Sequence, residues 1–522
     1  MPGGVPRSVT AVLVAACLTV LTACTVGPSQ RPPVAVRGDT APPVVTLPTP
    51  TPGPKVPDLE PQSALLDFVD CTTEALAELG PPPDDRTLRV ECGEIIVPTD
   101  HDDTSAGHTT LSVTRVGLAD APDDRPALLV VGDSATEPSA RFAVTLAARV
   151  PTTVLETFTL VGLDRRGAGA DVLDCAPAEA RAAILDTDPV AVTMRDLQRL
   201  LAHARDVVQD CYLLLSNTLR TYRSAATASD VEFLRVALGT NRLSAIGVGD
   251  GADALLIWAD ENPLAVGRLV LDGPSHPAAA EPEAAKARAA AAEAAFDRFA
   301  EACRSRPGCP LGADPRSAVS RLVEQLRERP LFTGDDEGLT AGRAVTALLV
   351  GLAEPNRWAE LAAALAAAAN GDPSGLLAVL EPVIGPDGRF DAELATTCND
   401  TARRLSPPEV VDLAARWRAE HPLFGVTFAT RLLACSPWPV GDAAEPDPGP
   451  GTPPVLVLGT AAGTRTDLAG TRAAADTLPE ARFVSWQGAG VGAYPRTPCV
   501  TSAVDGFLVD GTLPPDGMLC PP

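Results

Sequence analysis

Short apolar runs alternate with longer amphipathic stretches along most of the chain after residue 88. The continuously apolar runs at 127–131 and 159–163 are typical of strands buried on both faces of a sheet. A helix is predicted at 252–260. Strands alternating with helices predict an α/β fold with a doubly wound, mostly parallel sheet. Other predicted strands lie at 88–97 and 109–116 (an opening antiparallel pair), 243–248, 268–273, 454–458 and 482–486.

The segment between residues 273 and 397 has a different pattern. Alanine and leucine recur there at helical spacing, as in 284–302 and 359–369, without convincing strand runs. This pattern predicts a helical cap inserted into the sheet domain, because strand patterns resume after Pro453. We therefore assign residues 63–275 to the first part of the core, 276–396 to the cap and 397–522 to the C-terminal part of the core.

The N-terminus predicts export. Arg7 precedes an apolar run at 9–20, which is too short to cross a bilayer and fits a signal peptide over residues 1–23. The sequence ending at Cys24 is similar to the bacterial lipobox, which implies a lipid anchor at Cys24 and a place on the extracytoplasmic face of the cell membrane. Without acylation the same leader would release a secreted protein. The proline-rich residues 24–62 predict an extended tether.

Composition narrows the possible partners. The formal net charge of −25 argues against nucleic-acid binding and against docking on anionic lipid head groups. The cysteines after Cys24 are even in number and predict disulfides, with pairing of neighbours in order as the simplest arrangement. None forms C-x-x-C and histidines are few, so we predict neither a metal site nor a cofactor. These cysteines are Cys71, Cys92, Cys175, Cys211, Cys303, Cys309, Cys398, Cys435, Cys499 and Cys520.

A series of short motifs, in order, resembles the secreted tripeptidyl-aminopeptidase-like (TAP-like) serine hydrolases over about residues 65–522. The resemblance implies an α/β-hydrolase sheet, a helical lid and hydrolysis of peptides or esters by a Ser-His-Asp triad. The motifs are VEC at 90–92, VPTD at 97–100, GLDRRGAG at 162–169 with LDC at 173–175, Trp358 with GD at 371–372, TCND at 397–400, CSPWP at 435–439, PCV at 498–500 and DGTLP at 510–514.

The triad that the resemblance implies is absent from its expected positions. The nucleophile turn G-x-S-x-G corresponds to residues 247–251, where Gly249 replaces the serine. In 459–463 Ala462 stands in place of the acid, and in 488–492 Val491 stands in place of the histidine. The last histidine of the chain is His421. Loss of a triad nucleophile or base lowers turnover by about a million-fold.

Several other residues are candidates for chemistry. The oxyanion loop at 132–138 carries Asp133 and Glu137 where glycines are expected. Asp250, next to Gly249, is an alternative nucleophile, as in dehalogenase-like relatives, although no histidine follows to activate water. His276 lies at the predicted mouth of the cap. Four further features are expected to be structural: His101 and His108 in a solvated hairpin loop, residues 164–167 in a turn, Trp358 in packing, and Asp467 as a helix cap.

These observations predict an envelope lipoprotein with a TAP-like α/β-hydrolase fold that is catalytically inactive. It would bind a peptide or small ligand in its cleft, or act as a scaffold for an envelope protein. The alternative is an active hydrolase, an exopeptidase or esterase, that uses Asp250 or a displaced base.

Overall fold

A computed structural model describes residues 55–522 except 64–65, 78, 80–85, 123, 170–171, 278, 280, 334–336, 386–387, 440–445, 447–448 and 450. Residues 53–522 form one compact unit that holds every described core cluster. A unit with its own cores is expected to fold without the segment before it. The predicted signal peptide, Cys24 and most of the predicted tether lie outside the described residues.

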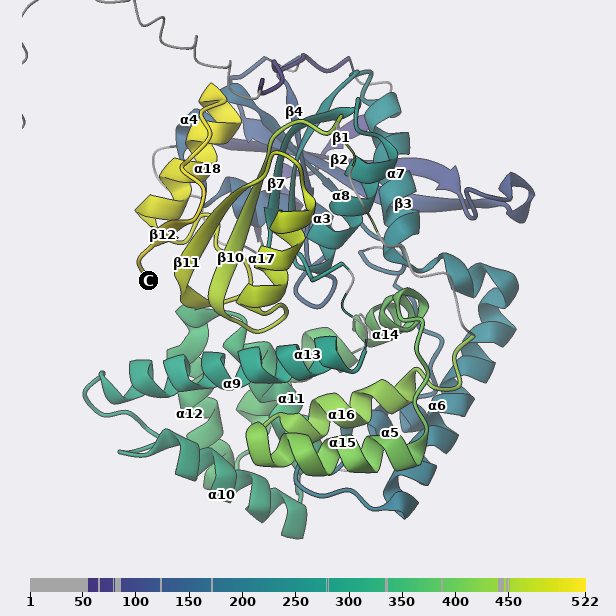
Figure 1. Ribbon diagram of the computed structural model, residues 1–522, viewed down its shortest axis with the longest axis vertical. Helices are drawn as coiled ribbons and strands as arrows, with labels where there is room; N and C mark the ends of the chain where they lie inside the picture. The colour runs from purple at the N-terminus through teal and green to yellow at the C-terminus, as the bar shows by residue number, and fades with distance from the viewer. Residues whose placement is uncertain are drawn as a thin grey trace, which may run out of the picture. The chain divides into compact units, whose positions relative to one another are not determined.

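The core is a ten-stranded sheet in the order β1-β2-β3-β5-β4-β6-β7-β10-β11-β12 (Figure 1). The first three strands and β5 pair antiparallel, and every pairing from β5 to β12 is parallel. The strands are β1 (Phe68–Asp70), β2 (Leu88–Pro98), β3 (His108–Leu118), β4 (Ala127–Val131), β5 (Thr159–Leu163), β6 (Leu243–Val248), β7 (Val266–Asp272), β10 (Val455–Gly463), β11 (Arg482–Gly490) and β12 (Met518–Cys520).

Continuously apolar strands carry helices on both faces. Every residue of β4, β5, β6 and β7 is buried, and for β4 and β5 the apolar runs at 127–131 and 159–163 predicted this. One face packs against α3 (Ser139–Ala147), α4 (Thr152–Thr157) and α18 (Pro498–Asp510), and the other against α7 (Ser224–Ala237), α8 (Asp250–Glu261) and α17 (Leu468–Thr477). The short α2 (Thr72–Ala77) lies beside β2. This sheet confirms the predicted α/β-hydrolase architecture.

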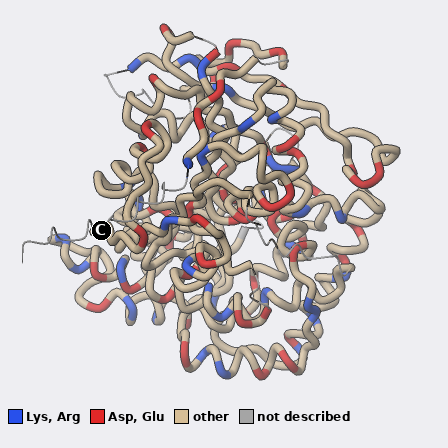
Figure 2. The backbone as a smooth tube through the Cα atoms, turned by 45° about the horizontal axis from the view of Figure 1, so that its top comes forward, with Lys and Arg blue, Asp and Glu red and all other residues tan. Residues whose placement is uncertain are grey.

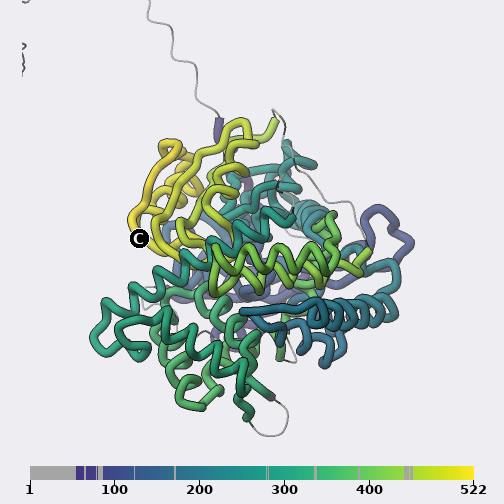
Figure 3. The backbone as a smooth tube through the Cα atoms, turned by 60° about the horizontal axis from the view of Figure 1, so that its bottom comes forward, coloured from purple at the N-terminus to yellow at the C-terminus, as the bar shows by residue number. Residues whose placement is uncertain are grey.

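The cap is built from two insertions rather than the single one predicted at 276–396. The first follows β5 and holds α5 (Ala178–Leu185), α6 (Met194–Leu215) and η2 (Ser216–Thr221). The second follows β7, and its helices α15 and α16 pack against α6 (Figures 1 and 3). It contains α9 (Glu283–Arg304), α10 (Pro315–Glu328), the hairpin β8 (Leu331–Thr333) and β9 (Glu337–Leu339), α11 (Ala341–Leu352), η3 (Pro355–Arg357), α12 (Trp358–Ala369), α13 (Ser374–Ile384), α14 (Phe390–Asp400), α15 (Pro407–Glu420) and α16 (Gly425–Ala434).

The N-terminal boundary of the core also differs from the prediction. Residues 55–62, which we call the N-terminal strap, lie against the sheet domain instead of belonging to the tether. Val56 and Leu59 pack on the core, and Pro57 O accepts a hydrogen bond from Arg268 Nε at 3.2 Å. Among the described residues no single helix is long and apolar enough to span a membrane, although the bent pair Pro355–Ala369 and Ser374–Ile384 meets that criterion together.

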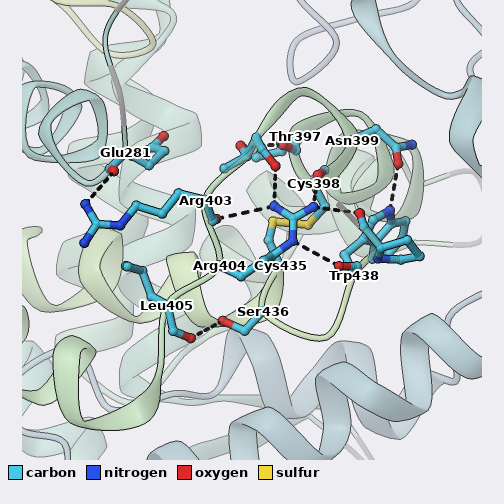
Figure 4. The surroundings of a disulfide bond; sticks show 12 residues. Glu281, Thr397, Cys398, Asn399, Arg403, Arg404, Leu405, Cys435, Ser436 and Trp438 are labelled. Atoms are coloured by element: carbon cyan, nitrogen blue, oxygen red, sulfur yellow. Dashed lines mark hydrogen bonds between the residues drawn. A yellow bond between two sulfur atoms is a disulfide. The ribbon is translucent and has the colours of Figure 1, made fainter. Parts of the chain in front are cut away.

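The ten cysteines form five disulfides between neighbours in order, as predicted. Three of these bonds lie in or against the cap. Figure 4 shows Cys398–Cys435, which joins α14 to the residue after α16. The same figure shows Arg404 donating to the carbonyl oxygens of Cys398 at 2.8 Å and Trp438 at 3.0 Å. The other pairs are Cys71–Cys92, Cys175–Cys211, Cys303–Cys309 and Cys499–Cys520.

Candidate functional site

The turn between β6 and α8 has the backbone of a nucleophile elbow. Gly249 caps α8 with φ 56° and ψ −124°, a strained conformation that a catalytic serine must adopt in this position. The turn also packs tightly against the end of β4, since a Cβ on Gly251 would lie 2.4 Å from Val131 O. The turn at 247–251 therefore has the backbone geometry expected of an elbow, and the residue at its apex carries no side chain.

The Asp133 carboxylate fills the space beside Gly249. A Cβ at position 249 would lie 2.0 Å from Asp133 Oδ2. The same oxygen lies 3.3 Å from the backbone N–H of Asp250, which donates to it. In an α/β-hydrolase the N–H of the residue after the nucleophile forms half of the oxyanion hole. Asp133 thus occupies both the nucleophile position and the place of a substrate oxyanion.

Two amides of the oxyanion loop are also bound to carboxylates of this chain. Ser134 N donates to Asp250 Oδ1 at 2.9 Å, and Ala135 N donates to Asp133 Oδ1 at 3.0 Å. Asp133 itself is only 1% exposed. Burial raises the pKa of Asp133, and the nearby Asp250 adds to the rise. The amides of Asp250, Ser134 and Ala135 are therefore all bound to carboxylates of this chain, so none of these three is available to a developing negative charge.

Asp250 lies in the cleft but is held by other groups. Arg165 Nη1 is 2.6 Å from Asp250 Oδ1, and the Ser134 hydroxyl donates to Asp250 Oδ2. Burial opposes ionisation of Asp250, but the guanidiniums of Arg165 and Arg465 hold its pKa below the usual range. Both carboxylate oxygens are thus engaged, which disfavours attack on a substrate. The expectation that Arg165 belongs to a structural turn was wrong, because it reaches this site.

A second arginine, which the sequence analysis missed, completes the network. Arg465, in the loop after β10, approaches Asp133 at 3.2 Å and Glu393 of the cap at 2.9 Å. Arg465 therefore links Asp133, beside the elbow, to Glu393 on α14. Its place at the carboxyl end of a parallel strand could have pointed to it, since ligand sites of open α/β sheets lie there.

The two remaining triad positions carry apolar side chains. Ala462 is 2% exposed within β10, and Val491 follows β11 and lines the cleft. Beneath the loop at 491–494 lies Asp272, whose Oδ2 accepts hydrogen bonds from Ala493 N at 2.7 Å and Tyr494 N at 2.9 Å. Burial raises the pKa of Asp272 to about 6. No histidine is among the described residues that contact this carboxylate.

The other residues considered from the sequence have mostly structural places. Asp467 caps α17, as expected, and Trp358 is buried with its ring 5.8 Å from that of Phe299. His108 is exposed, but His101 is not a solvated loop residue, because its Nε2 lies 2.7 Å from Asp230 Oδ1. Arg166 donates to both carboxylate oxygens of Asp230 at 2.8 Å.

A cavity of about 1480 Å³ lies above the elbow and is walled by both core and cap. Asp133, Asp250, Val491 and His276 line it on the core side. Nearby, Asp253 accepts a hydrogen bond from Ser275 N at 2.7 Å, and burial raises the pKa of Asp253 to about 7. The cleft above the elbow is therefore open. Within the described part of the chain, no three His, Cys, Asp or Glu side chains gather as metal ligands would.

The sequence matches the family model described as TAP-like protein over residues 421–520. Over this region the chain carries the TAP-like domain of the α/β-hydrolases. Three relatives show the extent of the similarity. It is 28% identical to serine protease Hip1 of Mycobacterium tuberculosis over 82% of this chain and 87% of that protein. It is 29% identical to carboxylesterase B of the same organism over 84% and 87%, and 23% identical to tripeptidyl aminopeptidase of Streptomyces lividans over 83% and 84%.

Solved structures similar to this chain include a hydrolase from Pseudomonas aeruginosa, with 17% identity and a TM-score of 0.33, covering 80% of this chain and 98% of that one. Another is the enol-lactonase from Burkholderia xenovorans, with 14% identity and a TM-score of 0.34, covering 77% and 96%.

Proposed function

We propose that this TAP-like hydrolase is a cell-envelope lipoprotein that binds a peptide or small ligand in its cleft without hydrolysing it. The observation that carries the proposal is the position of the Asp133 carboxylate, which fills the space of the nucleophile side chain. It also accepts a hydrogen bond from the Asp250 amide, the group that would stabilise an oxyanion. Oxyanion-hole donors account for much of the residual rate when a triad is lost. A protein that lacks both should hydrolyse esters and amides no faster than solution does.

The cleft supports binding rather than a purely structural role. Its volume of about 1480 Å³ exceeds the range of about 300–1,000 Å³ common for small-molecule sites. The cavity leaves room for a ligand, whereas a scaffold that had lost its ligand could have filled it. The lipid anchor at Cys24 belongs to the same proposal, and its support is the lipobox-like sequence alone.

Turnover is the decisive measurement. Residues 53–522 are assayed on nitrophenyl esters and tripeptide nitroanilides, with Asp250→Asn as the matched variant. We expect no saturable rate for either protein. A saturable rate that Asp250→Asn abolishes would overturn the proposal in favour of an Asp250-dependent hydrolase. A rate that survives in Asp250→Asn would point to a displaced base and would also overturn it.

A further inference from the structure

The cleft arginines differ in their pairing with acidic side chains. Five half-buried arginines line the cavity within the described part of the chain. Three of them contact a carboxylate: Arg288 with Glu281, Arg465 with Asp133 and Glu393, and Arg496 with Glu354. Arg389 and Arg431 have no carboxylate within ion-pair distance among the described residues.

Arg389 and Arg431 are held in place by neutral groups. Arg389, the residue before α14, donates to Ala135 O at 3.2 Å, and its buried Nε has no hydrogen-bond partner among the described residues. Arg431, on α16, donates to Thr346 Oγ1 at 3.2 Å, and its guanidinium carbon lies 6.0 Å from the centre of the Phe428 ring. These contacts orient the two guanidiniums but leave most of their N–H donors available.

The two arginines belong to one electrostatic cluster. Glu393 lies one helical turn after Arg389, and its charge also acts on Arg431. That carboxylate is already bound to Arg465 at 2.9 Å. The charge of Glu137 also acts on Arg389, but neither Arg389 nor Arg431 contacts a carboxylate among the described residues, so each guanidinium lacks a direct counterion. Burial lowers the pKa of both Arg389 and Arg431, as expected where a buried cation lacks a counterion.

The wall beside this cluster is apolar. Side chains of the cap helices line the cavity next to Arg431 and between α11, α13 and α16. A charged wall adjoining an apolar wall matches a ligand with an anionic head and a hydrocarbon body, because each part would leave water for a complementary surface. The apolar lining residues of these helices are Leu349, Val350, Val379, Val383, Phe428 and Leu432.

We propose that the cleft binds an amphipathic carboxylate, with its head between Arg389 and Arg431 and its hydrocarbon body along the cap helices. The inference rests on the proposed function, since it names the ligand class of the same non-hydrolysing cleft. Arginine suits this role because its planar guanidinium presents paired donors to a carboxylate.

The probe is dodecanoate, titrated calorimetrically into residues 53–522. Dodecanol supplies the same body without the charge, and butyrate supplies the head without the body. We expect saturable binding of dodecanoate that is at least tenfold tighter than binding of either comparison compound. Equal binding of dodecanoate and dodecanol, or no binding of dodecanoate, would overturn the proposal.

Variants then locate the head group. Arg389→Met and Arg431→Met keep most of the side-chain volume and should each weaken dodecanoate binding about tenfold or more while leaving dodecanol unchanged. Arg149→Met, at an exposed residue of the same cavity, is the matched control and should bind dodecanoate normally. Unchanged binding in both cleft variants would overturn the assignment. The melting temperature without ligand shows whether each variant is folded, and we expect Arg431→Met to be no less stable than the parent.

Hydrolysis of nitrophenyl dodecanoate in the same samples separates this inference from the proposed function. Turnover would refute the non-hydrolysing cleft whatever the binding data show. Absence of turnover together with no preference for the charged probe would refute only the ligand class.

Discussion

The clash between position 249 and Asp133 makes a specific prediction about Gly249→Ser. The new Cβ would overlap Asp133 Oδ2, and serine would also adopt a positive φ, so the free energy of unfolding should fall by more than the 1–3 kcal/mol, roughly, that backbone strain alone explains. Gly312→Ser is the matched control, because its φ is 76° and a Cβ added there would meet nothing within 4 Å. Denaturant unfolding measures both.

A double variant tests the same clash by removing the Asp133 carboxylate. In the double variant Gly249→Ser with Asp133→Ala, the overlap is gone, so part of the lost stability should return. The coupling between the two sites should be favourable, by about 0.5–3 kcal/mol, as for residues in direct contact. Strictly additive effects would mean that Asp133 does not occupy the nucleophile space. We expect no esterase activity in either variant, since Val491 still stands where the histidine belongs.

Asp253 should make stability depend on pH. Its folded-state pKa is about 7, raised by burial, whereas an unfolded aspartate titrates near about 4. Between these values the folded state binds more protons, so the free energy of unfolding falls as pH rises. Asp253→Asn keeps an acceptor for Ser275 N and should flatten this decline. Melting temperatures at about pH 5 and about pH 8 test it, with the exposed Asp206→Asn as control. Parallel curves for Asp253→Asn and the parent would contradict the prediction.

At the scale of elements, Asn399 on α14 joins the two cap insertions. Its side-chain amide donates to Leu219 O and Tyr222 O, both at 2.9 Å, and its oxygen accepts from Trp438 Nε1 at 2.8 Å (Figure 4). Asn399→Ala removes three hydrogen bonds and should lower the free energy of unfolding by about 3 kcal/mol. Asn370→Ala, which removes one exposed hydrogen bond, should lower it far less. Equal losses would show that Asn399 does not hold the insertions together.

The strands were predictable and the cap boundaries were not, for physical reasons. Runs such as 127–131 are apolar throughout because both faces of a parallel strand are covered, and this pattern survives in a single sequence. The helix α6 is amphipathic like any helix packed on a sheet. Its pattern therefore does not reveal that its apolar side meets α15 and α16 of the second insertion. The sequence pattern predicts each helix or strand, but it does not predict which other helices that element packs against.

The sequence predicted the triad positions of the candidate site but not the charged side chains that converge on it. Gly249, Ala462 and Val491 could be found because strand-turn-helix patterns fix the register around them. Arg165 and Arg465, which contact Asp250 and Asp133 at the elbow, belong to loops with no periodic signal. Their roles depend on loops that converge from different strands at one edge of the sheet.

At the scale of the whole molecule, acidic and basic side chains are interspersed over the described backbone (Figure 2). The local charge within the cleft therefore depends on particular pairs of acidic and basic side chains and not on the net charge of −25. Most half-buried cleft arginines have an acidic partner, and the two that lack one among the described residues mark the place where an anion would be stabilised most.

The N-terminal strap should contribute to the stability of the whole compact unit. A chain that begins at Ser63 loses the packing of Val56 and Leu59 and the acceptor at Pro57 for Arg268 Nε. We expect the free energy of unfolding to fall by about 3 kcal/mol relative to residues 53–522. Denaturant unfolding of the two chain lengths measures the difference.

Arg268→Met shows whether the strap acts through this arginine. Its guanidinium also donates to Leu508 O at 2.7 Å and Val509 O at 2.8 Å, so it ties the strap to the end of α18. In the longer chain the substitution breaks all three links, but in the shorter chain the link to Pro57 is already absent. The substitution should therefore destabilise the longer chain more. Equal losses in the two chains would mean that the strap stabilises the core by apolar packing alone, and no loss on shortening would place these residues back in the tether.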